Sequence, residues 1–308
     1  MTKLEPINQT QLFGLNNFLN DLVDLYEKNK LPNKILLSGQ KGLGKSTLAY
    51  HLINYVLSKD EKYNYDLKNL SINPENNSFK TILNKSNINF TLIDIDPEKK
   101  FIDINQIRDL ISNLNKSSFN QKPRFILIDN IELLNMNSIN ALLKTLEEPS
   151  TNIYFILINN NKKIVSTLLS RCINFKIFLS HLESMNVTNN LLKIKLNSKI
   201  NKDFINHYST PGSIYNLYIF CESQKFDLLN SNLKEFLEFV ITNNFYKKDH
   251  TLRDLIYNFV EYYFTKINLS SDIYNKYIYF IKKISDTKKF NLDEETLFIE
   301  FREEILNG

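Results

Sequence analysis

The chain has 308 residues, a length at which about two or three domains are expected. Its hydrophobic fraction of 43% is ordinary for a globular protein, and its net charge of +4 is too mild to argue by itself for nucleic-acid binding. No stretch approaches the length of a membrane span, the first residues lack the apolar core of a signal peptide, and the two cysteines, Cys172 and Cys221, provide neither a disulfide framework nor a metal site. We therefore expect a cytoplasmic protein with no membrane partner.

A phosphate-binding loop stands out near the start of the chain. A helical stripe over residues 18–26 and a short apolar strand over residues 34–37 lead into it. The loop has the spacing G-x-x-x-x-G-K-S, in which glycines let successive backbone N–H groups turn toward a phosphate. Lys45 would reach the β- and γ-phosphates, and Ser46 would offer its hydroxyl to Mg²⁺. The alternative is a glycine-rich turn with a stray lysine, which the strand-loop-helix setting disfavours.

The loop therefore predicts a site for ATP or ADP with Mg²⁺. The helix after the loop, ending near Leu57, would present its positive end to the anion. The residues predicted to bind nucleotide in this loop are Gly39, Gln40, Lys41, Gly42, Leu43, Gly44, Lys45, Ser46 and Thr47.

A polar stretch follows over residues 58–90, to which we assign no structure. An apolar strand is expected at residues 90–95, and a helix at 104–114 with Asp103 as its N-cap. Beyond residue 114 the alternation continues, with strands at 124–128, 153–158 and 173–178 and helices at 136–149 and 164–169. Such an alternation predicts an α/β fold, with a parallel sheet covered by helices on both faces.

Two strand ends carry polar residues of the kind that a nucleotide site uses. Asp129 ends a continuous apolar run, which is typical of a buried parallel strand that delivers a carboxylate to its C-terminal edge. We predict that Asp129 holds Mg²⁺ together with Ser46; a strand-end turn residue is the alternative. Asn159 ends the next strand and is predicted to contact the γ-phosphate or the attacking water, although a simple Asn-rich turn fits the spacing equally well.

After about residue 180 the strand pattern stops. Short helical stripes and a turn at Thr210-Pro211-Gly212 are expected up to residue 221, followed by four amphipathic helices that start from residue 225. Their stripes begin at Leu229, Leu252, Ile273 and Leu297, the last one capped by Asn291 or Asp293. We interpret their aromatic residues as bundle core rather than as base-stacking platforms. The expected division is a nucleotide-binding domain at 1–180, a helical lid domain at 181–221 and an all-α collar domain at 222–308.

The run Asn140-Ala-Leu-Leu-Lys-Thr-Leu-Glu-Glu-Pro149, followed by Ser170-Arg-Cys172, resembles the clamp loader subunits of bacterial DNA polymerase III, which are AAA+ ATPases. In motif terms the resemblance covers about residues 7–220, and the helical C-terminal part agrees in layout only. It implies an AAA+ fold with a lid and a collar domain. Within the family, the likeness favours the delta-prime type over the gamma/tau type.

Departures from the gamma/tau pattern support that choice. ATPase subunits of the family carry Glu after the metal-binding Asp, whereas this chain has Asn130, which can orient a water molecule but cannot take its proton. Glu132 lies two residues on and is not expected to reach the same point. Ser213 stands where the family usually has an arginine directed at the γ-phosphate, and residues 58–90 lack the cysteines of the zinc module that many relatives carry, so no zinc site is expected.

The resemblance also implies partners and a role for Arg171. In related loaders this arginine is a finger that enters the ATP site of the neighbouring subunit; a surface salt bridge is the alternative. The implied partners are the gamma/tau and delta subunits, and through them the sliding clamp and primed DNA. Two other functions stay open: an active gamma/tau-like ATPase subunit, and a module that binds DNA directly.

Overall fold

The computed structural model describes residues 4–96, 99, 101–114, 120–147, 152–206, 209–247, 250–267, 271–290 and 292–307. The chain forms two compact units. The first contains Met1–Asn190 together with Thr210–Gly212, and the second contains Leu191–Ser209 together with Ser213–Gly308. The division into nucleotide-binding, lid and collar domains stays a prediction.

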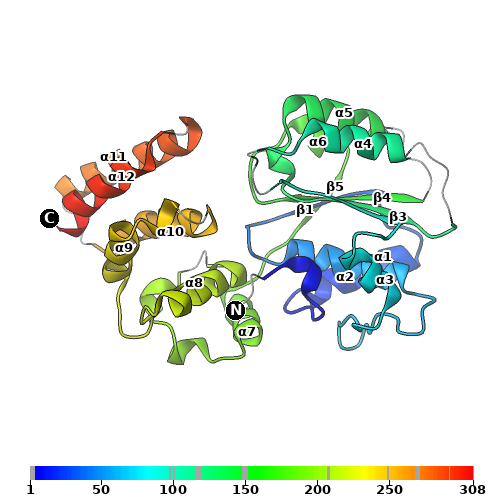
Figure 1. Cartoon of the computed structure of the whole chain (residues 1–308), viewed down its shortest axis with the longest axis horizontal. Helices are drawn as coiled ribbons and strands as arrows, with labels where there is room; N and C mark the ends of the chain where they lie inside the picture. Colours follow the sequence, from blue (N-terminus) through cyan, green and yellow to red (C-terminus); the bar gives the residue numbers. More distant parts are fainter. Residues whose placement is uncertain are drawn as a thin grey trace. The chain divides into compact units, whose positions relative to one another are not determined.

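A five-stranded parallel sheet forms the centre of the first unit, in the order β2-β3-β4-β1-β5 (Figure 1). The strands are short runs of apolar and β-branched residues, which suit a sheet that is buried on both faces. They are β1 (Lys34–Ser38), β2 (Phe90–Ile93), β3 (Arg124–Ile128), β4 (Ile153–Asn159) and β5 (Ile173–Lys176). The predicted parallel α/β sheet is confirmed.

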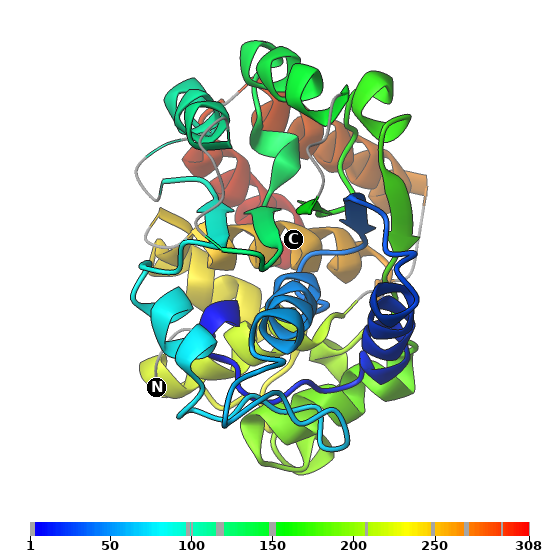
Figure 2. The same ribbon diagram turned by 90° about the vertical axis from the view of Figure 1, so that its right-hand side faces the viewer.

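Helices cover both faces of this sheet (Figures 1 and 2). Successive strand residues point to opposite faces, so Ile35 and Leu37 pack with α1 and α2, whereas Leu36 packs with α4 and α5. One face carries α1 (Asn16–Glu27), α2 (Lys45–Leu57) and α3 (Asn77–Leu83), and the other carries α4 (Ile104–Leu114), α5 (Met136–Glu147) and α6 (Ser166–Leu169). The helix predicted at 104–114 with Asp103 as its N-cap is confirmed, because the carboxylate of Asp103 accepts the Asn105 N–H at 2.9 Å.

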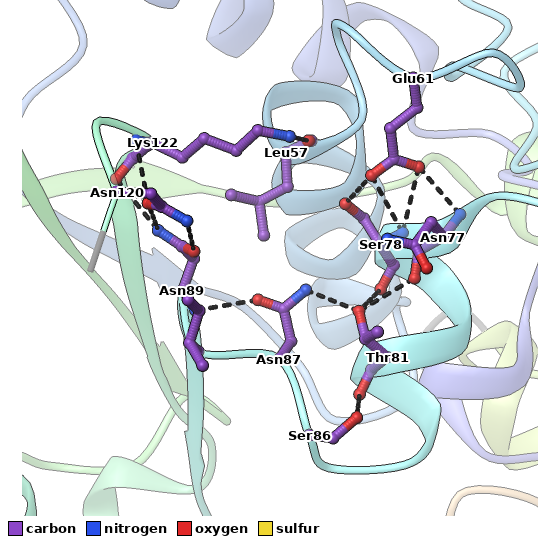
Figure 3. Close-up of a pocket in the computed structure, with 11 residues that line it drawn as sticks. Leu57, Glu61, Asn77, Ser78, Thr81, Ser86, Asn87, Asn89, Asn120 and Lys122 are labelled. Carbon is purple, nitrogen blue, oxygen red and sulfur yellow. Dashed lines mark hydrogen bonds between the residues drawn. The ribbon is translucent and has the colours of Figure 1, made fainter. Parts of the chain in front are cut away.

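The stretch 58–90, to which the sequence assigned no structure, packs on the α2 side of the sheet. Tyr65, Ile72 and Phe79 are buried in the same core as α1 and α2. Its polar residues bond one another around a pocket, shown in Figure 3. There Glu61 accepts the Ser78 N–H and hydroxyl at the start of α3. The segment therefore contributes to the core as well as to the surface.

His51 of α2 ties this segment to the N-terminal residues. Its ring is fully buried and lies 3.0 Å from the Gln9 carbonyl oxygen and 2.8 Å from the Tyr65 hydroxyl. Because a carbonyl oxygen only accepts, Nε2 carries the proton and Nδ1 accepts from Tyr65. Burial lowers the pKa of His51 to about 4, so this ring is neutral in the folded chain at neutral pH.

The first unit also contains most of α7 (His181–Leu192, of which the residues up to Asn190 lie in this unit), which lies against the chain just before α1. Gly14 has a φ of +73°, and a Cβ built at this position would lie 2.3 Å from Cγ2 of Val187. Glycine alone allows both the backbone conformation and the close approach of α7. None of the helices in the described part of the chain is both long and apolar enough to cross a bilayer.

The described residues of the second unit form helices joined by turns and loops, with no strand among them, and its aromatic stripes form the core, as predicted. Phe236 contacts Phe204 and Phe259 edge-on at 5.6 Å in both cases, and further along Phe301 contacts Phe264 and Phe280. The helices are α8 (Pro211–Gln224, of which Ser213 onward lies in this unit), α9 (Leu233–Thr242), α10 (His250–Phe264), α11 (Ser271–Phe290) and α12 (Glu294–Phe301), followed by a π-helical turn at Arg302–Leu306.

Two boundaries differ from the sequence-based expectation. Pro211 and Gly212 are not a turn but the first residues of α8, because proline suits the first position of a helix. Leu229 lies outside α9, which begins after Asn232 in a capping box with Glu235. At the last helix, Asp293 is the N-cap, and the alternative Asn291 lies outside the described residues.

The buried imidazole of His51 predicts a pH-dependent stability. The pKa of His51 is about 4 in the folded chain and 6.5 ordinarily, so the unfolded chain takes up a proton that the folded chain excludes. The contribution is complete above pH 6.5 and is lost as the pH falls toward 4. At pH 5 the loss is expected to be about 2 kcal/mol.

Urea unfolding of the full chain and of His51→Gln at pH 7.5 and 5.0 measures this loss. The free energy of unfolding should fall more for the natural chain than for His51→Gln, and the comparison cancels the contributions of other groups. His181→Gln, at an exposed position, is the matched control and should behave as the natural chain does. Equal pH dependence in all three chains would contradict the assignment of a buried neutral His51.

Candidate functional site

The phosphate-binding loop lies between the end of β1 and the start of α2. Gly42 and Gly44 have φ values of +88° and +90°, and Gly44 is the N-cap of α2. These conformations favour glycine, which explains the spacing of the motif. Leu43 between them is buried, and Thr47 lies in the first turn of α2. The predicted strand-loop-helix setting is therefore confirmed.

A segment distant in sequence holds the loop from outside. The Thr210 hydroxyl donates to the Lys41 carbonyl at 2.9 Å, and the Gly212 N–H donates to the Gly42 carbonyl at 2.9 Å. Because the C=O and N–H of one peptide point in opposite directions, these contacts turn the N–H groups of Gly42 and Leu43 to the other side. That orientation suits a loop whose N–H groups receive an anion.

Lys45 is buried at the centre of the loop. Its ammonium group donates to the carbonyl oxygens of Gly39 and Gln40 at 2.9 and 2.7 Å, and to Oδ1 of Asn160 at 3.0 Å. Burial lowers the pKa of Lys45 to about 8, while the charges of Asp129 and Glu132 act in the opposite direction. The acceptors that touch this cation are all neutral.

Ser46 and Asp129, predicted to hold Mg²⁺, are in contact. The Ser46 hydroxyl donates to Oδ2 of Asp129 at 2.5 Å, across the gap between α2 and the end of β3. Burial, and next the charge of Asp94, raise the pKa of Asp129 to about 6, and the bond from Ser46 lowers it. The hydroxyl oxygen of Ser46 and a carboxylate oxygen of Asp129 are ligands of the kind that Mg²⁺ prefers, and they lie close enough to share one ion.

The side chain of Asn159 lies in the Asn-rich turn that the sequence left open as an alternative, and its contact with the γ-phosphate or the attacking water stays a prediction. The Asn159 side chain turns into its own loop, donating to the Lys162 carbonyl at 2.9 Å and accepting the Lys162 N–H at 3.0 Å. Asn160, the next residue, bonds to Lys45 instead. Strand alternation places consecutive side chains on opposite faces, and the run of three asparagines gave no signal to choose between them.

Asn130 and Glu132 meet at Asn160, contrary to the expectation that Glu132 lies elsewhere. The Nδ2 of Asn160 donates to Oδ1 of Asn130 at 2.8 Å and to Oε1 of Glu132 at 3.0 Å. Asn130 has a φ of +53° and starts a 3₁₀ turn at Ile131–Leu133, which brings Glu132 back toward β4. Sequence spacing alone does not reveal such a reversal.

Asp94 is a further residue of this network that sequence reasoning did not select. Its Oδ1 accepts from Nδ2 of Asn130 at 2.8 Å. Its position directly after β2, at the same edge of the sheet as Asp129, could have indicated a place in the site. The carboxyl ends of β2, β3 and β4 thus bring Asp94, Asn130 and Asn160 together.

Arg171 lies away from this network and forms a surface ion pair. Its guanidinium donates to Oε1 of Glu147 at 2.5 Å and to the Thr167 carbonyl at 2.7 Å. This ion pair is the alternative that the sequence left open for Arg171, and a role toward a neighbouring subunit stays a prediction. Two residues of the same motif run, Glu148 and Pro149, lie outside the described residues.

Comparison with known proteins agrees with this fold. The model of the family described as "DNA polymerase III, delta subunit" matches residues 14–180. The DNA polymerase III subunit gamma/tau of Mycoplasma genitalium is 32% identical over 174 residues, which are 56% of this chain and 28% of that protein. The DNA polymerase III subunit delta' of Buchnera aphidicola subsp. Baizongia pistaciae is 31% identical over 157 residues, 47% of this chain and 44% of that protein.

The chain spans about half or less of the length of these curated relatives. Among solved structures, a DNA polymerase III gamma subunit-related protein of Thermotoga maritima aligns with a TM-score of 0.52 at 17% identity, covering 92% of this chain and 96% of that one. At this identity the likeness concerns the fold. Together with the match over more than half of its length, these findings show that the chain belongs to the DNA polymerase III delta subunit family, the clamp loader subunits with an AAA+-like fold.

Proposed function

We propose that the chain is a delta-prime-like subunit of the DNA polymerase III clamp loader, the complex that opens the sliding clamp and closes it on primed DNA. It binds ATP or ADP at its own loop, hydrolyses ATP poorly, and offers Arg171 to an adjacent ATPase subunit of the gamma/tau type. Its other implied partner is the delta subunit. Family membership supports the general role, and the residues of the site support the finer one.

The observation that carries the proposal is the side chain at the end of β3. Asn130 takes the place of a carboxylate, and both ends of its amide are engaged, with Asp94 and with Asn160. An amide cannot accept the proton of an attacking water, so the local chemistry favours binding over hydrolysis. Ser213 in place of an arginine removes one cation that would meet the γ-phosphate.

The residues present fit a bound nucleotide with Mg²⁺. The loop Gly39–Ser46 would surround the phosphates with N–H groups, and Ser46 and Asp129 would hold the ion. The ion would supply charge neutralisation at the phosphates. Lys45 would exchange its neutral acceptors for phosphate oxygens, which would offset the cost of keeping an ammonium group buried.

The second candidate is a gamma/tau-like subunit with its own ATPase activity. The observation that favours it is the position of Glu132, a carboxylate bonded to the same amide of Asn160 as Asn130. Both of its oxygens accept hydrogen bonds from Asn160, however, so the carboxylate is directed at the tip of β4. Steady ATP turnover by the purified chain, abolished by Lys45→Ala, would favour this candidate.

Removing the buried ammonium group tests the nucleotide site. Lys45→Ala should weaken binding of Mg²⁺-ADP by about 10- to 100-fold, because a charge-assisted contact to phosphate is lost. Isothermal titration calorimetry of the full chain measures this affinity. Lys59→Ala is the control, since Lys59 follows the end of α2 opposite to the loop and pairs there with Glu27; its affinity should stay near the natural value. Equal affinities in all three chains would contradict a nucleotide site at this loop.

The proposed contact of Arg171 with the ATP site of a neighbouring subunit is tested in the assembled loader. Arg171→Ala should lower the clamp- and DNA-stimulated ATPase rate of a loader reconstituted with the gamma/tau and delta subunits by about 10³-fold, while leaving this chain's own nucleotide affinity unchanged. Arg171→Lys keeps the charge but loses the planar fork, and should recover only part of the rate.

Glu147→Gln is the matched control for this experiment. It removes the carboxylate that holds Arg171 in the single chain, and it should not lower the loader rate. Because an exposed ion pair of this kind contributes about 0–1 kcal/mol, Arg171 can leave Glu147 at little cost. An unchanged rate with Arg171→Ala would refute the finger role.

A further inference from the structure

The proposed function assigns no role to the carboxylate of Glu132. The 3₁₀ turn after β3 carries it to the tip of β4. There Oε1 accepts from Nδ2 of Asn160 at 3.0 Å, and Oε2 accepts the backbone N–H of Asn160 at 3.3 Å. Two donors from one residue fix the position of this negative charge.

A single amide group separates Glu132 from the ammonium group of Lys45. Asn160 donates to Glu132 with its Nδ2 and accepts from Lys45 with its Oδ1. In a loop of this kind the lysine reaches the β- and γ-phosphates, and the loop N–H groups surround the inner phosphates. The negative charge of Glu132 is therefore fixed one amide away from the ammonium group that would bind the outer phosphate.

Acidic groups outnumber basic ones in this network. Asp94, Asp129 and Glu132 are joined to it by hydrogen bonds through Asn130, Ser46 and Asn160, and Lys45 is the cation that the same bonds include. A γ-phosphate brings additional negative charge to the point where a carboxylate is already fixed. A diphosphate leaves that point free of phosphate and keeps its contacts with the loop and Lys45.

We propose that Glu132 makes this site selective for nucleoside diphosphates over nucleoside triphosphates. The inference rests on the proposed function in that it takes the loop Gly39–Ser46 as a nucleotide site. It adds which nucleotide the site retains and which side chain sets the preference. A site of this kind holds ADP as a structural ligand of a subunit that hydrolyses little ATP.

Nucleotide binding by the full chain tests the proposal without an activity assay. Isothermal titration calorimetry with Mg²⁺-ADP and with the β,γ-imido analogue of ATP gives two dissociation constants for each chain. We expect the natural chain to bind ADP about tenfold more tightly than the analogue. Glu132→Gln and Glu132→Ala should bring the two constants to within about threefold of each other, mainly through tighter binding of the analogue.

The control removes a negative charge elsewhere in the same unit. Glu75 is exposed and pairs with Lys80 beyond the far end of α2, so Glu75→Gln should keep the tenfold preference. Thermal unfolding verifies that each variant is folded, and two Glu132 variants guard against the failure of one. A natural chain that prefers the triphosphate analogue, or a preference that both Glu132 variants retain, overturns this inference and leaves the nucleotide site standing. A folded natural chain that binds neither ligand overturns the nucleotide site and this inference together.

Discussion

The burial of one ammonium group constrains the whole loop. Lys45 is removed from water, and a buried charge is tolerated only when its donors are satisfied. The two loop carbonyls and the Asn160 amide satisfy the geometry of these donors but carry no full charge. The lowered pKa of Lys45 expresses this incomplete compensation. A buried cation with neutral partners is a natural receptor for an anion of the right size.

The same constraint explains why a segment far along the chain belongs to the first unit. The carbonyls of Gly39 and Gln40 accept from Lys45, so the carbonyls of the next two residues need hydrogen-bond donors on another side. Thr210 and Gly212 provide these. A Cβ on Gly212 would lie only 2.8 Å from the Cα of Gly42, so the approach requires a glycine. The start of α8 thereby becomes part of the support of the phosphate-binding loop.

The sequence was informative where apolar periodicity decides the structure. The strands, the flanking helices and the helical bundle follow from patterns of burial, and the phosphate-binding loop follows from the glycine spacing. Polar contacts at strand ends depend instead on single backbone angles. The positive φ of Asn130 turns the backbone so that Glu132 contacts Asn160. At the end of β4, it is Asn160 and not its neighbour Asn159 that bonds to Lys45. Neither contact can be recognised from a periodic pattern in the sequence. The residue types therefore predicted where the site lies but not which hydrogen bonds it contains.

The two cations of interest, Lys45 and Arg171, illustrate opposite uses of charge. Lys45 is buried among neutral acceptors, so its interactions are strong and its position is fixed by the fold. Arg171 is partly exposed and pairs with the exposed Glu147 at the surface, where an ion pair contributes only about 0–1 kcal/mol. A buried cation can hold a ligand of its own chain, whereas a weakly paired one at the surface can exchange its partner for a neighbour's phosphate. In the proposed function Lys45 binds the nucleotide of its own chain and Arg171 contacts that of a neighbour. Because both residues are cations, this difference follows from their burial and not from their charge.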